Sequence, residues 1–233
     1  KDYADAHRTN GGLPETAPFM GIATCDTMGG GAGPMQWGAV LPYLAELLYN
    51  HTGSLDTAAR HWAVGEQWMA LLEQSANASA APMHRAHVLT SGLGAQVVGC
   101  VSAPAAFLGT AYLHEQARIM ARLAEAQGLA ARAAHYRQLQ LDVYDAFQAA
   151  FYVNGTYGNG TQAALITALG LDLVPAAHRA AAVSALRASV AATGYFDVDA
   201  FTVWLAGRTI CEAGLGEQFY AWLVSTRAPS YGI

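Results

Sequence analysis

The sequence predicts an all-α fold, and three observations support this prediction. From Met35 onward, apolar residues recur at the spacing that places them on one face of a helix. No segment shows a convincing β-strand alternation of apolar and polar residues. Stretches rich in glycine, proline and asparagine separate the periodic segments, as expected for loops between helices.

About eight helices are expected, in the order helix, short loop, helix. Residues 1–36 are dense in glycine and proline and should form an irregular N-terminal segment of a single domain spanning residues 1–233. Ser54 is a candidate N-cap, and Gly128 is a candidate helix-ending glycine. The expected helices are residues 35–49, 54–75, 103–128, 130–152, 162–170, 175–194, 200–208 and 212–225.

The composition favours an architecture in which helices are covered on more than one side. Hydrophobic residues make up 53% of the chain and charged residues only 12%, against about 25% charged residues in typical soluble domains. Such helices suit a two-layer toroid, in which an outer ring covers an inner one. Periodicity alone also allows a simpler helical bundle.

Four of the five asparagines lie in Asn-X-Ser/Thr sequons, which are acceptors for N-glycosylation. They are Asn50, Asn77, Asn154 and Asn159, and all four are expected in loops. This usage predicts a glycoprotein of the secretory pathway, secreted or held at the cell surface. The chain also begins at Lys1 rather than at methionine, which we interpret as a processed or truncated product.

Three cysteines, Cys25, Cys100 and Cys211, are too widely spaced for a zinc knuckle or a C-x-x-C redox motif. An odd number in a secreted chain leaves one thiol free or paired with something else. Buried structural thiols are the alternative, and the pairing stays open.

Charge and motifs exclude several classes of partner. The net charge of −5 disfavours nucleic acid and anionic membranes, and no apolar run is long enough to span a bilayer. The glycine run at residues 29–33 lacks the lysine and Ser/Thr of a phosphate-binding loop, so no cofactor is expected. No metal is expected either. The "LHEQAR" sequence at residues 113–118 has Arg118 where a zinc helix needs histidine, and His84 and His87 lack a third ligand.

Several segments, taken in order, resemble the catalytic domain of glycoside hydrolase family 78, the α-L-rhamnosidases. These are "NGGLPETAPF" (10–19), the segment from "QWGAVLPYLAELLY" to "MALLE" (36–73), "LGTAYLHEQARIMARLAEAQG" with the helix after it (108–152), "GTQAALITALGLDLVP" (160–175) and "GLGEQFYAWLVSTRAPSYGI" (214–233).

This resemblance implies an (α/α)6 barrel, here partial, and inverting hydrolysis of terminal α-L-rhamnose. Inversion needs one carboxylic acid to protonate the leaving oxygen and one carboxylate to activate water. In the family, the acid lies upstream of the segment at which this chain begins, and the base follows the "PSYG"-like motif. Both catalytic residues are therefore expected outside this chain. The family's aspartate after Trp-Gly is Ala39 here, and its Gly-Asp-Trp sequence is Gly94-Ala95-Gln96.

Three residues are candidates for contact with a sugar. Trp37 could stack on an apolar sugar face, although a core position is the alternative. Asp197 and Asp199 precede a helix and could bind sugar hydroxyls, although N-capping explains them equally simply. The other tryptophans, at positions 62, 68, 204 and 222, are explained by packing.

Two functions remain open at this point. The first is a secreted α-L-rhamnosidase-like hydrolase whose catalytic pair lies in the remainder of its polypeptide. The second is a non-catalytic structural or carbohydrate-binding glycoprotein that retains the barrel. Under either function, the expected partners are a rhamnoside and either the rest of the same polypeptide or other extracellular glycoprotein chains.

Overall fold

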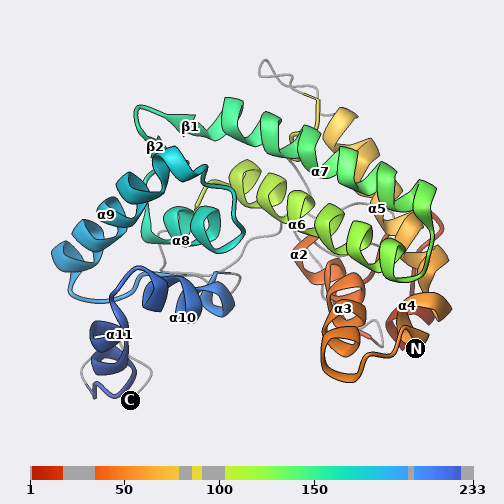
Figure 1. Ribbon diagram of the computed structural model, residues 1–233, viewed down its shortest axis with the longest axis horizontal. Coiled ribbons are helices and arrows are strands. Elements are labelled where there is room, and N and C mark those ends of the chain that lie inside the picture. The colour runs from red at the N-terminus through yellow and green to blue at the C-terminus, as the bar shows by residue number, and fades with distance from the viewer. Residues whose placement is uncertain (1, 18–34, 79–85, 91–102, 199–201, 227–233) are drawn as a thin grey trace. The chain divides into compact units, whose positions relative to one another are not determined.

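The computed structural model describes residues 2–17, 35–78, 86–90, 103–198 and 202–226 (Figure 1). The chain divides into two compact units, residues 1–95 with 109–147 and residues 96–108 with 148–233. Among the described residues, every element except one short hairpin is helical, which confirms the predicted all-α class.

The first unit contains α1 to α5 and most of α6 and α7. Their bounds are α1 Asp2–Asp5, α2 Met35–Gly38, α3 Val40–Thr52, α4 Asp56–Arg60, α5 Trp62–Ala78, α6 Ala105–Ala126 and α7 Ala130–Phe151. One buried cluster joins α3, α4 and α6 through Ala45, Ala58, Ile119 and Leu123. The small alanine side chains allow these helices to approach closely.

The second unit is built around α8 (Gln162–Gly170), all of whose residues are buried. Helices α9 (Ala176–Thr193) and α10 (Val203–Glu212) both pack against it (Figure 1). A Cβ on Gly170 would lie 2.7 Å from Thr209 Oγ1, so only glycine allows α10 to come this close. The last helix, α11 (Gly216–Leu223), packs on α10.

The structure divides two helices that the sequence predicts as continuous. Residues 35–52 form α2 and α3 because Pro42, in the first turn of α3, has no N–H to continue the helical ladder. Residues 56–78 form α4 and α5, which meet at His61. Ser54 behaves as predicted in part, since its hydroxyl accepts a hydrogen bond from the Asp56 N–H, although Leu55 is the N-cap residue.

The predicted loop around residues 153–161 contains the one hairpin of the described chain. Strand β1 (Tyr152–Val153) pairs antiparallel with β2 (Thr156–Tyr157). The two residues between them, Asn154 and Gly155, have φ values of 53° and 80°. Positive φ at both positions is the signature of a type I′ turn, for which Asn-Gly is strongly preferred.

Two sequons predicted in loops lie in helices instead. Helix α3 continues through Asn50 and ends where Gly53 adopts a left-handed φ of 70°. Helix α5 continues through Asn77 to Ala78. The N-terminal segment, predicted to be irregular throughout, contains the short helix α1.

Candidate functional site

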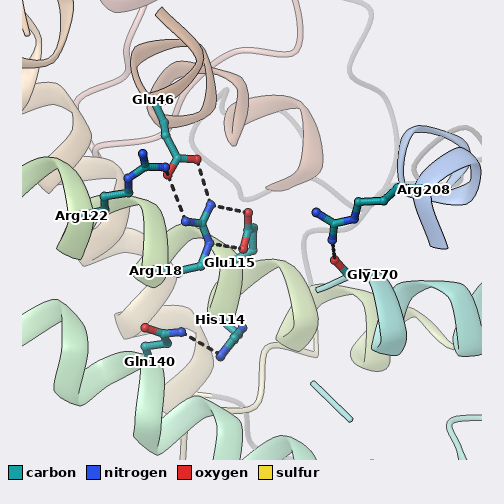
Figure 2. Close-up of polar contacts among 8 residues, drawn as sticks. All are labelled: Glu46, His114, Glu115, Arg118, Arg122, Gln140, Gly170 and Arg208. Atoms are coloured by element: carbon teal, nitrogen blue, oxygen red, sulfur yellow. Dashed lines mark hydrogen bonds and ion pairs between the residues drawn. The ribbon is translucent and has the colours of Figure 1, made fainter. Parts of the chain in front are cut away.

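A cluster of four charged side chains joins α3 to α6 in the first unit (Figure 2). Both Nη atoms of Arg118 donate to the carboxylate of Glu46, at 3.0 and 2.8 Å. Nε and Nη2 of the same guanidinium donate to Glu115, at 2.7 and 2.8 Å. Arg122 adds a hydrogen bond of 3.1 Å to Glu46. The two carboxylates are almost fully buried, with side-chain exposures of 7% and 10%.

This geometry suits the cluster to holding helices together rather than to moving protons. The hydrogen bonds that Arg118 donates to Glu115 and Glu46 raise the pKa of Arg118 above its ordinary value, outweighing the opposite effect of burial. Two carboxylates and two guanidiniums balance in charge, as buried ionic groups require. A general acid must carry a proton into the reaction, whereas these carboxylates accept hydrogen bonds from arginine.

His114 lies beside the cluster on the buried side of α6. Burial, and secondarily the positive charge of Arg118, lower its pKa to about 4, so the ring is neutral at pH 7. The Gln140 amide nitrogen on α7 lies 3.2 Å from Nε2 (Figure 2). If this amide donates, the ring proton is on Nδ1. No group of three or more potential metal ligands occurs within the described residues.

The structure places Trp37 in α2 with 45% of its surface exposed, so the core interpretation of this residue is wrong. Its backbone carbonyl accepts a hydrogen bond from the Tyr3 hydroxyl at 3.1 Å, which fixes the helix start against α1. Trp68 is fully buried as predicted, whereas Trp204 is also 45% exposed, contrary to the packing interpretation.

Asp197 lies in the loop before α10 and does not cap it, because the N-cap residue is Thr202. Its backbone N–H donates to Gln162 Oε1 at 3.0 Å. The amide nitrogen of Gln162 donates to Thr193 Oγ1 and to the Tyr195 carbonyl, at 2.9 and 3.1 Å. The buried Gln162 side chain therefore sets the path of the loop that carries Asp197.

Asp199 lies outside the described residues, as do His84, Cys25, Cys100 and the Gly94–Gln96 segment. Cys211 carries an exposed, free thiol, so the buried interpretation is wrong for this cysteine. Trp37 belongs to the first unit and Asp197 to the second, and each is described within its own unit.

A pocket of about 220 Å³ lies in the second unit, next to the loop that carries Asp197. Tyr195, Phe196 and Trp222 contribute aromatic walls, and Arg187 and Gln218 contribute polar groups. Aromatic lining residues with a few polar groups suit a small polar ligand that has an apolar face.

The ionic cluster of Glu46, Glu115, Arg118 and Arg122 is not among the features expected from the sequence. The spacing of Glu115 and Arg118, i and i+3 on one helix, is a signal for their pairing. Glu46 is 72 residues from Arg118 in the chain, so nothing in local sequence could identify it as the shared partner.

Comparison with known proteins gives the family. The family model for the bacterial α-L-rhamnosidase six-hairpin glycosidase domain matches residues 1–233. No curated protein matches the chain in sequence. Within the described chain, no helix is long and apolar enough to cross a membrane.

Solved structures support the same fold. An α-L-rhamnosidase from Streptomyces avermitilis, complexed with L-rhamnose, is 24% identical with a TM-score of 0.76. Those from Dictyoglumus thermophilum and Aspergillus terreus are 17% and 19% identical, with TM-scores of 0.81 and 0.73. The alignments cover 98–99% of this chain but only 21%, 26% and 27% of those chains, respectively.

The predicted fold class, an α/α toroid present in part, is therefore confirmed. The chain belongs to the family of the bacterial α-L-rhamnosidase six-hairpin glycosidase domain.

Proposed function

We propose that this chain is part of a secreted α-L-rhamnosidase-like glycoside hydrolase, which removes terminal α-L-rhamnose with inversion. The observation that carries the proposal is the family match over all 233 residues. The Streptomyces relative, an α-L-rhamnosidase complexed with L-rhamnose, supports the substrate class.

The chemistry requires two carboxyl groups about 6.5–9.5 Å apart, on opposite sides of the sugar. One protonates the glycosidic oxygen as the bond to the anomeric carbon breaks. The other removes a proton from the water that attacks this carbon from the opposite face. We place both groups outside residues 1–233, because the family resemblance puts the acid upstream of this segment and the base after its "PSYG" motif.

In this proposal the chain supplies scaffold, and each compact unit contributes its own candidate sugar contacts. The exposed indole of Trp37 stacks on an apolar sugar face. Because the indole is 45% exposed, it can do so without leaving a position in the core. The carboxylates of Asp197 and Asp199 accept hydrogen bonds from sugar hydroxyls.

Two exposed apolar stripes support a further role for the remainder of the polypeptide. Leu44, Leu47 and Leu48 follow the i, i+3, i+4 spacing on α3 and are all exposed. The same spacing recurs with Tyr220, Leu223 and Val224 at α11. Since the chain spans only 21–27% of its structural relatives, we propose that helices of its own polypeptide cover these stripes.

The test is hydrolysis of an aryl α-L-rhamnoside by the complete protein, followed by proton NMR of the released sugar. We expect aglycone release with β-L-rhamnose as the first product, and no release from the matching aryl β-D-glucoside. Release of α-L-rhamnose first would contradict inversion, and no release would contradict the hydrolase.

One observation favours the alternative, a non-catalytic carbohydrate-binding glycoprotein. The sequence has Ala39 and Gly94-Ala95-Gln96 where the family resemblance leads one to expect carboxylates and a tryptophan. If the alternative holds, the complete protein binds L-rhamnose, measured by calorimetry, but leaves the aryl rhamnoside intact.

A further inference from the structure

The four sequon asparagines differ in what the fold does with their side chains. All four are exposed. Asn77 Oδ1 accepts a hydrogen bond from the His87 N–H at 3.3 Å. Asn159 Oδ1 accepts two from Thr161, at 3.3 Å from its N–H and 2.7 Å from its hydroxyl. Asn50 is held within the last turn of α3.

Asn154 is placed differently, at the tip of the β1–β2 hairpin (Figure 1). Its φ of 53° puts it in the first central position of the tight turn, and its amide has no hydrogen bond to any described residue. Val153 beside it is 50% exposed, so the tip projects apolar surface into solvent. Thr156, which completes the sequon, is the first residue of β2 and pairs with Val153.

Side-chain contacts on both strands anchor the hairpin to its unit. The buried Tyr157 donates its hydroxyl proton to Gln148 Oε1 at 3.0 Å. The Gln148 amide in turn donates to the Leu173 carbonyl at 2.6 Å. On the other strand, the Tyr152 ring stacks on His178 with centroids 4.2 Å apart.

We propose that Asn154 is an N-glycan attachment site, with the glycan covering the hairpin tip. This inference rests on the secretory part of the proposed function and not on hydrolysis. In the reaction, Nδ2 of Asn154 attacks the anomeric carbon of a polyprenyl-diphosphate-linked oligosaccharide. The C–N bond forms, the bond to the diphosphate oxygen breaks, and Nδ2 gives up one proton.

The test uses the protein secreted by its own cells, treated with a peptide N-glycosidase in H₂¹⁸O and analysed by mass spectrometry. Removal of a glycan converts Asn154 to ¹⁸O-labelled aspartate. Asn10 is the matched control, because glycine follows it as it follows Asn154 but it lies outside any sequon. It reports the spontaneous deamidation to which Asn-Gly is prone.

We expect the label at Asn154 and none at Asn10. In a secretory expression host, Thr156→Ala should also increase gel mobility by one glycan, whereas Thr156→Ser keeps the sequon and should not. An unlabelled Asn154, or equal mobility of both variants, overturns the inference. Since aryl rhamnoside hydrolysis is assayed separately, failure here is distinguishable from failure of the proposed function.

Discussion

At the scale of single residues, Arg118 matters because two buried carboxylates depend on one guanidinium. Glu46→Gln removes the buried carboxylate that Arg118 and Arg122 share, while the two arginine side chains stay 35% and 48% exposed. Removing one partner from a fully buried pair costs about 3–5 kcal/mol, and the partial exposure of Arg118 reduces this to about 2 kcal/mol. Urea-induced unfolding measures the loss.

The matched control is Glu125→Gln. It breaks the exposed pair with Arg137 at the end of α6, the helix that carries Arg118. Exposed pairs contribute little, so this change should stay within about 0.5 kcal/mol of the wild type. Equal losses in the two variants would contradict the structural role of the cluster.

His114 makes stability depend on pH. Its pKa falls from 6.5 in the unfolded chain to about 4 when folded, so the unfolded state binds the proton more readily. The contribution of His114 to the free energy of unfolding is complete above pH 6.5 and is lost as the pH falls toward 4. Since one pKa unit corresponds to about 1.4 kcal/mol, the full effect is about 3 kcal/mol.

The measurement is urea unfolding at pH 7, 5.5 and 4 for the wild type and His114→Gln. We expect the wild type to lose about 3 kcal/mol more than the variant over this range. His51→Gln, a change at an exposed histidine, should follow the wild-type profile. Parallel profiles for wild type and His114→Gln would show that His114 is not held neutral by the fold.

Trp37 and Trp204 are equally exposed. Comparing their alanine variants therefore distinguishes a sugar-binding role from the effect of losing any exposed tryptophan. Trp37→Ala should raise KM for an aryl α-L-rhamnoside about tenfold in the complete enzyme, since loss of a stacking face is worth roughly 1–1.5 kcal/mol. Trp204→Ala should leave KM unchanged. A similar rise in KM for both variants would contradict a sugar contact at Trp37.

At the scale of elements, the contact between α8 and α10 depends on the absence of a side chain at Gly170. Gly170→Ala brings a Cβ to 2.7 Å from Thr209 Oγ1 and 3.2 Å from Leu205, which should destabilise by about 1–3 kcal/mol. Gly207→Ala in α10 meets nothing closer than 3.8 Å and should gain up to about 1 kcal/mol in helix propensity. Opposite signs in urea unfolding are the expected result, and equal signs would contradict this packing.

The two helices that flank the glycine- and asparagine-rich loop at residues 153–161 could be predicted from the sequence almost residue by residue. Helix α8 matches its expected range, and α7 differs by one residue. The predicted bounds are wrong where a single residue ends or extends a helix. In the expected helix 35–49, Pro42 separates α2 from α3, and α3 ends at Gly53 rather than at Asn50. The hairpin was missed because its strands are two residues long, too short for alternation, although Asn154-Gly155 is itself a turn signal.

At the scale of the whole molecule, the family could be recognised because its motifs recur in order along the chain. The sugar-contact residues could not be placed with equal certainty, since Trp37 is separated from Asp197 by 160 positions and belongs to another compact unit. The catalytic pair could not be located at all. The chain covers only 21–27% of its structural relatives, and the buried carboxylates among its described residues, Glu46 and Glu115, serve an ionic cluster.

We propose that this chain is the scaffold part of a rhamnoside hydrolase whose catalytic carboxylates lie outside residues 1–233. The most direct measurement compares aryl α-L-rhamnoside hydrolysis by the complete protein and by residues 1–233 alone, at equal concentration. We expect aglycone release by the complete protein and only the uncatalysed rate with the chain alone. Hydrolysis by residues 1–233 alone, or none by the folded complete protein, would contradict it.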